Sequence, residues 1–298
     1  MNPSDRSIGL AAALGAFMAW GLAPIYFKLL GQVGADEIIA HRVLWSVVFL
    51  VLVLVLRHRR GLLEHLRPAP GVLWALLISG SLIVVNWLIF IHAVNSDRVL
   101  STSLGYFINP LVTVVFGLLF FRERLAPLQW AGVGIAALGT LYMTVRVGEF
   151  PWIALGLALS FALYSVIRKR LDVGPMVGLF WETVLMAPLA LAWLFWLGFN
   201  ARLAFEPAQF GAALLLAGTG LVTVVPLLLF AAGVRRLPLS TIGIMQYLAP
   251  TITFFLAVFV YSEPFTFDHG ITFACIWLGL FLFSWAGWVR VRRARIPV

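Results

Sequence analysis

The sequence predicts an all-α integral membrane protein with ten transmembrane helices, arranged as two related five-helix halves in opposite orientations. Three observations carry this prediction: long apolar segments recur along all 298 residues, basic residues gather on alternate loops, and the second half aligns with the first at a fixed offset. Hydrophobic residues make up 62% of the chain and charged residues only 11%, whereas a soluble domain carries about a quarter charged residues. The lipid bilayer therefore replaces water around most of the molecule.

Ten apolar segments are long enough to span a membrane, which takes about 20 residues in a helix. Short stretches that contain charged residues, Pro or Gly separate them. Because the apolar segments continue to the end of the chain, a single cleaved signal peptide does not explain them. We expect spans at 8–30, 36–56, 71–94, 98–121, 127–145, 151–168, 176–197, 209–233, 239–260 and 269–289.

The basic residues predict the orientation. Assigning the loops alternately to two sides places 16 of the 21 Lys and Arg residues on one side and four on the other, with Arg42 inside a span. By the positive-inside rule both termini are cytoplasmic, in a multi-pass protein of the inner (plasma) membrane. The net charge of +9 does not predict nucleic-acid binding, since the basic residues form only short clusters at the ends of spans. The basic side carries Arg6, Arg57, Arg59, Arg60, Arg67, Arg122, Arg124, Arg168, Lys169, Arg170, Arg235, Arg236, Arg290, Arg292, Arg293 and Arg295.

An internal repeat divides the chain into residues 1–147, with spans one to five, and residues 148–298, with spans six to ten. At an offset of 140 residues the equivalent pairs are Pro110 with Pro250, Thr113 with Thr253, and Glu123 with Glu263. Since five is odd, the second copy enters the membrane from the opposite side. Inverted repeats of this kind are typical of transporters, in which two halves open a central site alternately to each side.

The chain resembles the drug/metabolite transporter superfamily over essentially its whole length. The motifs lie at Gly15–Lys28, Glu37–Ser46, Asn109–Leu111 and Glu123–Arg124. They resemble the EamA-type permeases, with the first two closest to the RarD-like branch. The resemblance implies secondary transport, commonly export of amino acids, as in YddG-like exporters of aromatic amino acids. RarD-like members carry a chloramphenicol-resistance label, so drug efflux is the alternative. The first span has no acidic residue of the kind with which small multidrug members bind cations.

Two ionisable residues inside spans are the first candidates for the site. Arg42, next to His41, and Glu182, next to Trp181, are equivalent at the offset of 140. Ionisable groups are costly in a membrane and usually face a cavity or a partner. The pair could hold the carboxylate and ammonium of an amino acid, and Glu182 is the candidate for proton coupling. Alternatively both side chains reach the extracellular interface, or form local ion pairs, including one with each other.

Further candidates are polar or aromatic residues at mid-helix depth. The fourth and ninth spans each carry a polar stripe with a proline, which either lines a watered cavity or packs between helices. Aromatic rings could stack on cargo or anchor the chain in lipid. These candidates are Ser103, Tyr106 and Asn109 on the fourth span, Gln246 and Tyr247 on the ninth, Trp20 and Pro24 on the first, Asn86 and Phe90 on the third, and Tyr164 on the sixth.

Motifs that would indicate an enzyme or a cofactor are absent from the sequence. There is no phosphate-binding Gly-Lys-Ser/Thr loop, so transport does not draw on ATP within this chain. The five histidines lack zinc-site spacing, and Cys275 is the single cysteine. We therefore expect no metal, no cofactor and no catalysis, and favour a small-molecule exporter over a lipid-modifying enzyme or a passive channel. A homodimer and a monomer both fit the sequence.

Overall fold

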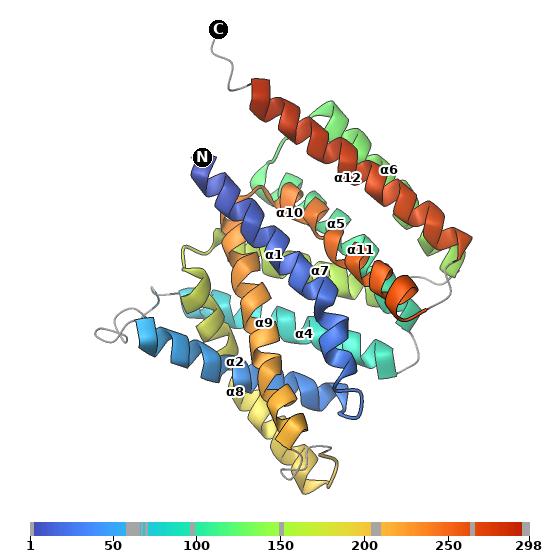
Figure 1. Cartoon of the computed structure of the whole chain (residues 1–298). Helices are drawn as coiled ribbons and strands as arrows, with labels where there is room; N and C mark the ends of the chain where they lie inside the picture. Colours follow the sequence, from blue (N-terminus) through green and yellow to red (C-terminus); the bar gives the residue numbers. More distant parts are fainter. Residues whose placement is uncertain are drawn as a thin grey trace.

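The computed structural model describes residues 3–57, 66, 68, 71–95, 99–148, 152–203, 210–262 and 266–293. Within these ranges nine helical segments are long and apolar enough to cross a membrane, and α5 adds a shorter apolar run at 106–121. The predicted all-α membrane fold is confirmed. The helices, labelled as in Figure 1, are α1 (Pro3–Lys28), α2 (Ala35–Arg57), α4 (Val72–Asn95), α5 (Val99–Phe121), α6 (Pro127–Val147), α7 (Trp152–Arg170), α8 (Pro175–Phe199), α9 (Phe210–Arg236), α10 (Leu239–Met245), α11 (Leu248–Phe255) and α12 (Phe267–Arg293).

The ninth predicted span is not one continuous helix. It is divided into α10, α11 and a π-helical turn at Leu256–Val260. Pro250 has no backbone N–H and its ring crowds the carbonyl of Gln246, four residues earlier. That carbonyl instead accepts the N–H of Ala249 at 3.3 Å. The equivalent Pro110 leaves α5 unbroken, so the break belongs to the second half alone.

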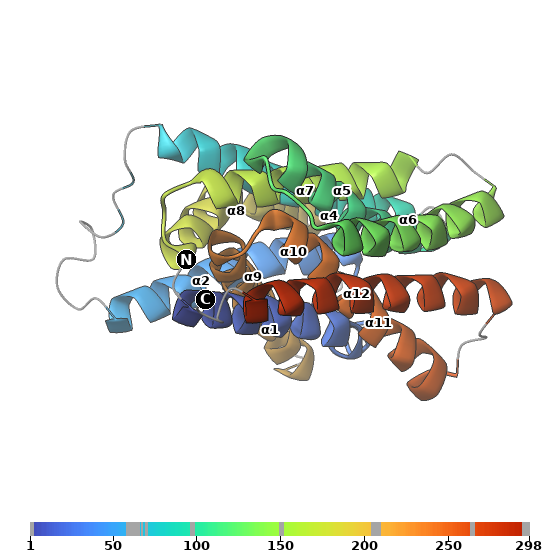
Figure 2. The ribbon, with the colours of Figure 1, turned by 90° about the horizontal axis from the view of Figure 1, so that it is seen from above.

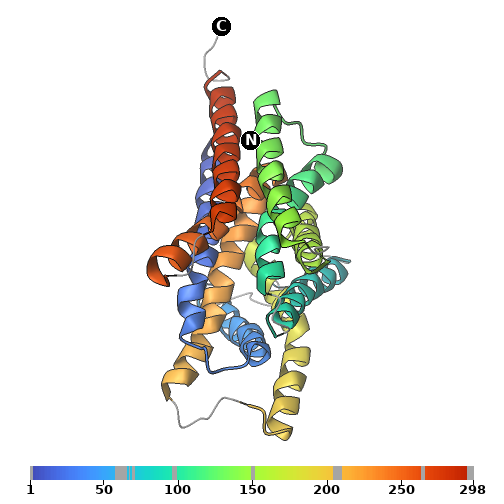
Figure 3. The ribbon, with the colours of Figure 1, turned by 90° about the vertical axis from the view of Figure 1, so that its right-hand side faces the viewer.

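The two halves interleave. From the first half, α1 packs on α9 and α11, α2 packs on α8 and α9, α4 packs on α7 and α8, and α5 packs on α7 and α10. Figures 1 and 3 show α1 and α9 side by side. The largest contacts of each half are therefore made with the other half, as expected of two copies that form one core.

The last helices of the two halves, α6 and α12, form a pair at one edge of the bundle (Figures 1 and 2). Glycines permit their close approach: a Cβ atom added at Gly132 would lie 2.6 Å from the carbonyl oxygen of Gly279. Lipid provides no hydrophobic driving force between helices, so their association depends on van der Waals packing, which small residues make closer.

Those residues predicted to be cytoplasmic that the structure describes gather at one end of the bundle, which we call the basic end. There the Lys169 ammonium donates to the carbonyls of Val234, at 3.0 Å, and Leu237, and the Arg170 guanidinium donates to the Phe120 carbonyl at 3.3 Å. The Glu123 carboxylate accepts the first N–H groups of α10. Helix α1 begins and α12 ends at this end (Figure 1), and which membrane face it occupies stays a prediction.

Candidate functional site

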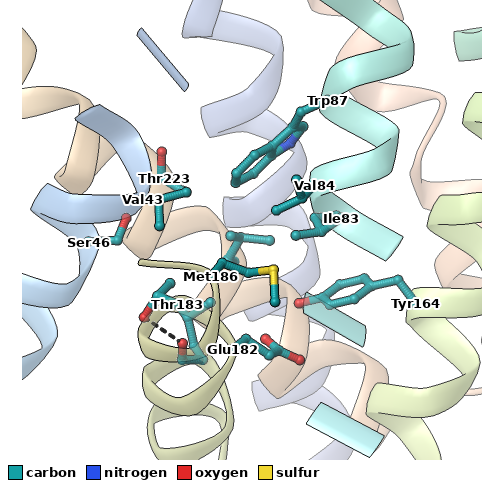
Figure 4. Close-up of a pocket in the computed structure, with 12 residues that line it drawn as sticks. Val43, Ser46, Ile83, Val84, Trp87, Tyr164, Glu182, Thr183, Met186 and Thr223 are labelled. Carbon is teal, nitrogen blue, oxygen red and sulfur yellow. Dashed lines mark hydrogen bonds between the residues drawn. The ribbon is translucent and has the colours of Figure 1, made fainter. Parts of the chain in front are cut away.

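A small cavity lies between α2 and α4 of the first half and α7, α8 and α9 of the second (Figure 4). Its volume is about 20 Å³, which is room for roughly one water molecule. Sites that bind small molecules usually measure about 300–1,000 Å³, so this cavity is too small for cargo as it stands. The lining residues are Val43, Ser46, Ile83, Val84, Trp87, Tyr164, Leu179, Glu182, Thr183, Met186, Thr223 and Leu227.

Glu182 is the charged residue in this lining. It lies two turns into α8, is only 3% exposed, and accepts a hydrogen bond from the Ser79 hydroxyl of α4. The Arg168 guanidinium of α7 lies 3.6 Å from the same carboxylate oxygen. Figure 4 shows the Tyr164 hydroxyl pointing toward the Glu182 carboxylate. A buried carboxylate needs such partners, because an isolated charge is very costly away from water.

Arg42 is held beside the cavity by α9 and α4. Its Nε donates a hydrogen bond of 2.9 Å to the Thr223 hydroxyl, which lines the cavity. Its guanidinium carbon lies 4.4 Å from the centre of the Trp87 ring and 5.3 Å from that of Phe27. A cation over aromatic faces is stabilised by their negative charge density, the more so when water is excluded.

No ion pair joins Arg42 and Glu182 among the described residues, and the cation beside the Glu182 carboxylate is Arg168 instead. Their partners on α4, Trp87 and Ser79, are eight residues apart, which is about 12 Å along a helix. The ammonium and carboxylate of an α-amino acid share one carbon atom, so these two groups do not span that separation at the same time.

The expectation that both charges lie at the same depth, near the extracellular interface, is wrong, because Arg42 and Glu182 lie toward opposite ends of the bundle. Helix α8 runs antiparallel to α2, and the indole N–H of Trp181 donates to the carbonyl of Leu66, beyond the end of α2, at 2.7 Å. Glu182 thus lies toward the basic end and Arg42 toward the opposite end. An inverted repeat explains this, since equivalent residues of oppositely oriented copies lie at opposite depths.

The remaining candidates from the first half lie around the cavity or away from it. The Trp20 ring packs against the rings of Phe17, Phe161 and Phe230. Asn86 donates to the Leu157 carbonyl and the Ser160 hydroxyl at 2.8 and 2.9 Å, which fixes α4 to α7. His41 lies 3.9 Å from the buried Glu37 carboxylate, one turn earlier on α2. None of these, nor Pro24, Phe90 or Trp181, is among the described residues that line the cavity.

The polar stripes of the fourth and ninth spans lie between helices in this structure. The Thr113 hydroxyl is 3.3–3.4 Å from the Gln246 amide and 3.5 Å from Asn109, and the Tyr247 hydroxyl donates to the Phe107 carbonyl at 3.1 Å. The Tyr106 side chain is half exposed. The side chain of Ser103 lies outside the described residues. Thr113, Gln246 and Tyr247 therefore contribute helix packing in this structure, whereas the half-exposed Tyr106 does not follow this pattern.

Sequence reasoning missed Arg168, Ser79 and Thr223. Arg168 counted as one of three basic residues at a loop, although it follows Tyr164 by four residues and so shares its helix face. That spacing was the available signal. Ser79 and Thr223 are small polar residues within apolar spans, and Thr223 follows Thr219 by one helical turn, but this spacing does not show which charged side chain each one contacts.

Comparison with known proteins gives a consistent result over the whole chain. The model of the EamA-like transporter family matches residues 7–145 and again 151–285. An uncharacterized transporter of Vibrio cholerae is 44% identical over 95% of this chain and 94% of its own length. Protein RarD of Escherichia coli K12 is 43% identical over 95% of this chain and 96% of its own length.

A more distant relative, from Pseudomonas aeruginosa, is called chloramphenicol-sensitive protein RarD and is 32% identical over 93% of both chains. A crystal structure of a protein with 18% identity covers 94% of this chain and 98% of its own, with a TM-score of 0.71. That likeness concerns the fold alone.

Proposed function

The chain belongs to the EamA-like transporter family, as its motifs predicted, and from this premise we propose that it exports amino acids or similar small metabolites. Transport occurs across the bacterial inner membrane by alternating access. The cargo passes through the cavity between the two halves, with Arg42 and Glu182 as its charged binding groups. No step of this cycle is catalytic, and the bilayer is the chain's surroundings.

The observation that carries this proposal is the placement of two opposite charges about one cavity. Glu182 lines the cavity directly, and Arg42 borders it through Thr223 and Trp87. The ammonium of an amino acid can bind Glu182 and its carboxylate can bind Arg42, at different stages of transport. The cargo meets Glu182 near the basic end and Arg42 near the other, so the two groups are used in succession.

The size of the cavity supports a mechanism with moving halves. About 20 Å³ holds no amino acid, so the site has to widen before cargo enters. The lining comes from α2 and α4 of one half and α7, α8 and α9 of the other, and separation of these helices enlarges the cavity toward one side at a time. This is the geometry of alternating access in inverted-repeat transporters.

Glu182 also serves as the proton-coupling residue in this proposal. It is a buried carboxylate that faces the cavity, and burial makes its charge depend on the partner present. Exchange of a proton for cargo at one carboxylate couples export to the proton gradient without ATP. The Glu182→Gln variant should then transport without any response to a pH gradient.

The cargo class is tested by uptake of radiolabelled amino acids into liposomes that contain the purified protein. We expect saturable uptake of a subset that includes aromatic amino acids, and a loss of at least tenfold in Arg42→Ala. Arg146→Ala is the matched control, since that arginine lies away from the cavity at the end of α6 and pairs with Asp268 at 3.1 Å. The absence of uptake for every amino acid would refute the cargo assignment.

Drug efflux is the second candidate. A relative bears the name chloramphenicol-sensitive protein RarD, and the ring cluster around Trp20 and Phe230 next to Tyr164 offers an aromatic wall beside the cavity. A shift in chloramphenicol resistance on expression, without amino-acid uptake in liposomes, would favour this candidate. Accumulation against a gradient distinguishes either transporter from a passive channel.

A further inference from the structure

Arg168 behaves differently from the two basic residues that follow it. Lys169 and Arg170 bind backbone carbonyls at the basic end, whereas the Arg168 side chain turns into the bundle and is only 1% exposed. Its Nη1 lies 3.6 Å from a Glu182 carboxylate oxygen, and its Nη2 donates to the Pro175 carbonyl at 3.3 Å. An arginine side chain is almost never buried to this degree unless it is paired with another group.

Helix α8 provides that place through Gly178. Pro175, Gly178 and Glu182 are spaced by three and four residues and share one helix face. A Cβ atom at Gly178 would lie 1.9 Å from the Arg168 Nη1, so any other residue there would displace the guanidinium. The missing side chain of Gly178 therefore leaves the space in which the Arg168 guanidinium lies against α8, next to the Glu182 carboxylate.

The pair is neutral overall but loosely bonded. Nε and Nη1 of Arg168 have no hydrogen-bond partner among the described residues, and the shortest contact to Glu182 exceeds an ideal hydrogen bond. The other polar neighbours of the carboxylate are the hydroxyls of Ser79 and Tyr164. Glu182 lines the cavity, whereas Arg168 is not among the described residues of its lining.

We propose that Arg168 is a positioning residue of the transport site: it is the resident counter-ion that holds Glu182 as a carboxylate until a cation from the cavity replaces it. The replacing cation is an ammonium group of the cargo or a proton. The proposal rests on the transport function above and deepens it, because it assigns cation exchange to one end of the cavity. A buried carboxylate stripped of its counter-ion takes up a proton rather than staying charged.

Infrared spectroscopy of the purified protein at pH 7 tests the charge of Glu182 without any cargo. In Arg168→Gln we expect a new protonated-carboxyl band, equivalent to a single carboxyl group per chain. That band should be missing in the wild type and in the double variant Arg168→Gln/Glu182→Gln. Arg168→Lys keeps a positive charge and should show little of the band, which a purely structural role of the side chain would not require.

Two glycines at the start of α8 provide a matched pair that leaves both charged residues in place. Gly178→Ala displaces the guanidinium and should produce the same band as Arg168→Gln. Gly174→Ala, one turn earlier, adds a Cβ atom that meets nothing within 4 Å and should leave the spectrum unchanged. If Arg168→Gln does not fold, the glycine pair alone decides the question.

Adding cargo identifies the replacing cation. Phenylalanine should remove at least half of the band in Arg168→Gln if its ammonium binds Glu182, whereas phenylpropionate, which lacks the amine, should not. A band that both compounds leave intact assigns the exchange to protons. An Arg168→Gln or Gly178→Ala spectrum without the band would overturn the proposal, whatever the liposome assay shows for amino acids. Failure of uptake alone, with the band present, would refute only the cargo.

Discussion

Glu123 should stabilise the basic end by closing the start of α10. Its two carboxylate oxygens accept the N–H groups of Leu239 and Ser240 at 2.5 and 2.8 Å. Hydrogen bonds to charged groups are each worth about 1.5–3 kcal/mol, and a carboxylate at a helix N-terminus adds about 0.3–1 kcal/mol. Because Gln keeps one acceptor oxygen and loses the charge, Glu123→Gln should lower the free energy of unfolding by about 2–3 kcal/mol.

The assay is unfolding of the purified protein in mixed micelles with increasing sodium dodecyl sulfate, followed by tryptophan fluorescence. Asp172→Asn is the control, since this acid at the same end is fully exposed in its pair with Arg235 and exposed ion pairs contribute at most about 1 kcal/mol. Equal losses in the two variants would refute the reasoning that the carboxylate of Glu123 holds α10.

Three further outcomes follow from contacts elsewhere in the bundle. In the same unfolding assay, Arg168→Met and Glu182→Met should each cost about 3–5 kcal/mol and the double variant much less than the sum, whereas additive losses would show that the two charges do not interact. Gly132→Leu forces the α6–α12 pair apart and should cost about 1–3 kcal/mol, while Gly134→Leu, whose added Cβ meets nothing within 4 Å, should not. Thr223→Val removes the acceptor of the Arg42 Nε, costs about 1–3 kcal/mol and should raise the KM for cargo, which an unchanged KM would contradict.

Most of the fold followed from the sequence because membrane spans have a strong signal. About 20 apolar residues between charged loops leave few alternatives to a helix, and the family motifs agree with the two matched segments. The break at Gln246 was missed because Pro110 and Pro250 read alike in the sequence. The structure distinguishes them, because α5 continues through Pro110 whereas the helix is interrupted before Pro250.

The site was predictable only in part. Arg42 and Glu182 were named from the sequence because ionisable groups are rare within spans, and Tyr164 was named as an aromatic ring at mid-helix depth; the structure places Glu182 and Tyr164 in the cavity lining and Arg42 beside it. The pairing of Glu182 with Arg168 was not predicted, since Arg168 lies beside Lys169 and Arg170 and, like them, was interpreted as an orientation signal. Sequence position gives depth along one helix but not which helix lies opposite, so the choice between Arg42 and Arg168 as the partner of Glu182 required the structure. The roles of these residues in transport stay predictions.

The most direct test of the central claim is amino-acid uptake into liposomes with an acidic interior, compared with uptake without a pH gradient, for the wild type and Glu182→Gln. We expect the gradient to drive accumulation by the wild-type protein above the external concentration. The variant should show at most equilibration, with the same rate in both conditions. Gradient-driven accumulation that persists in Glu182→Gln would contradict proton exchange at this carboxylate, and no uptake by the wild type would contradict the assignment of amino acids as cargo.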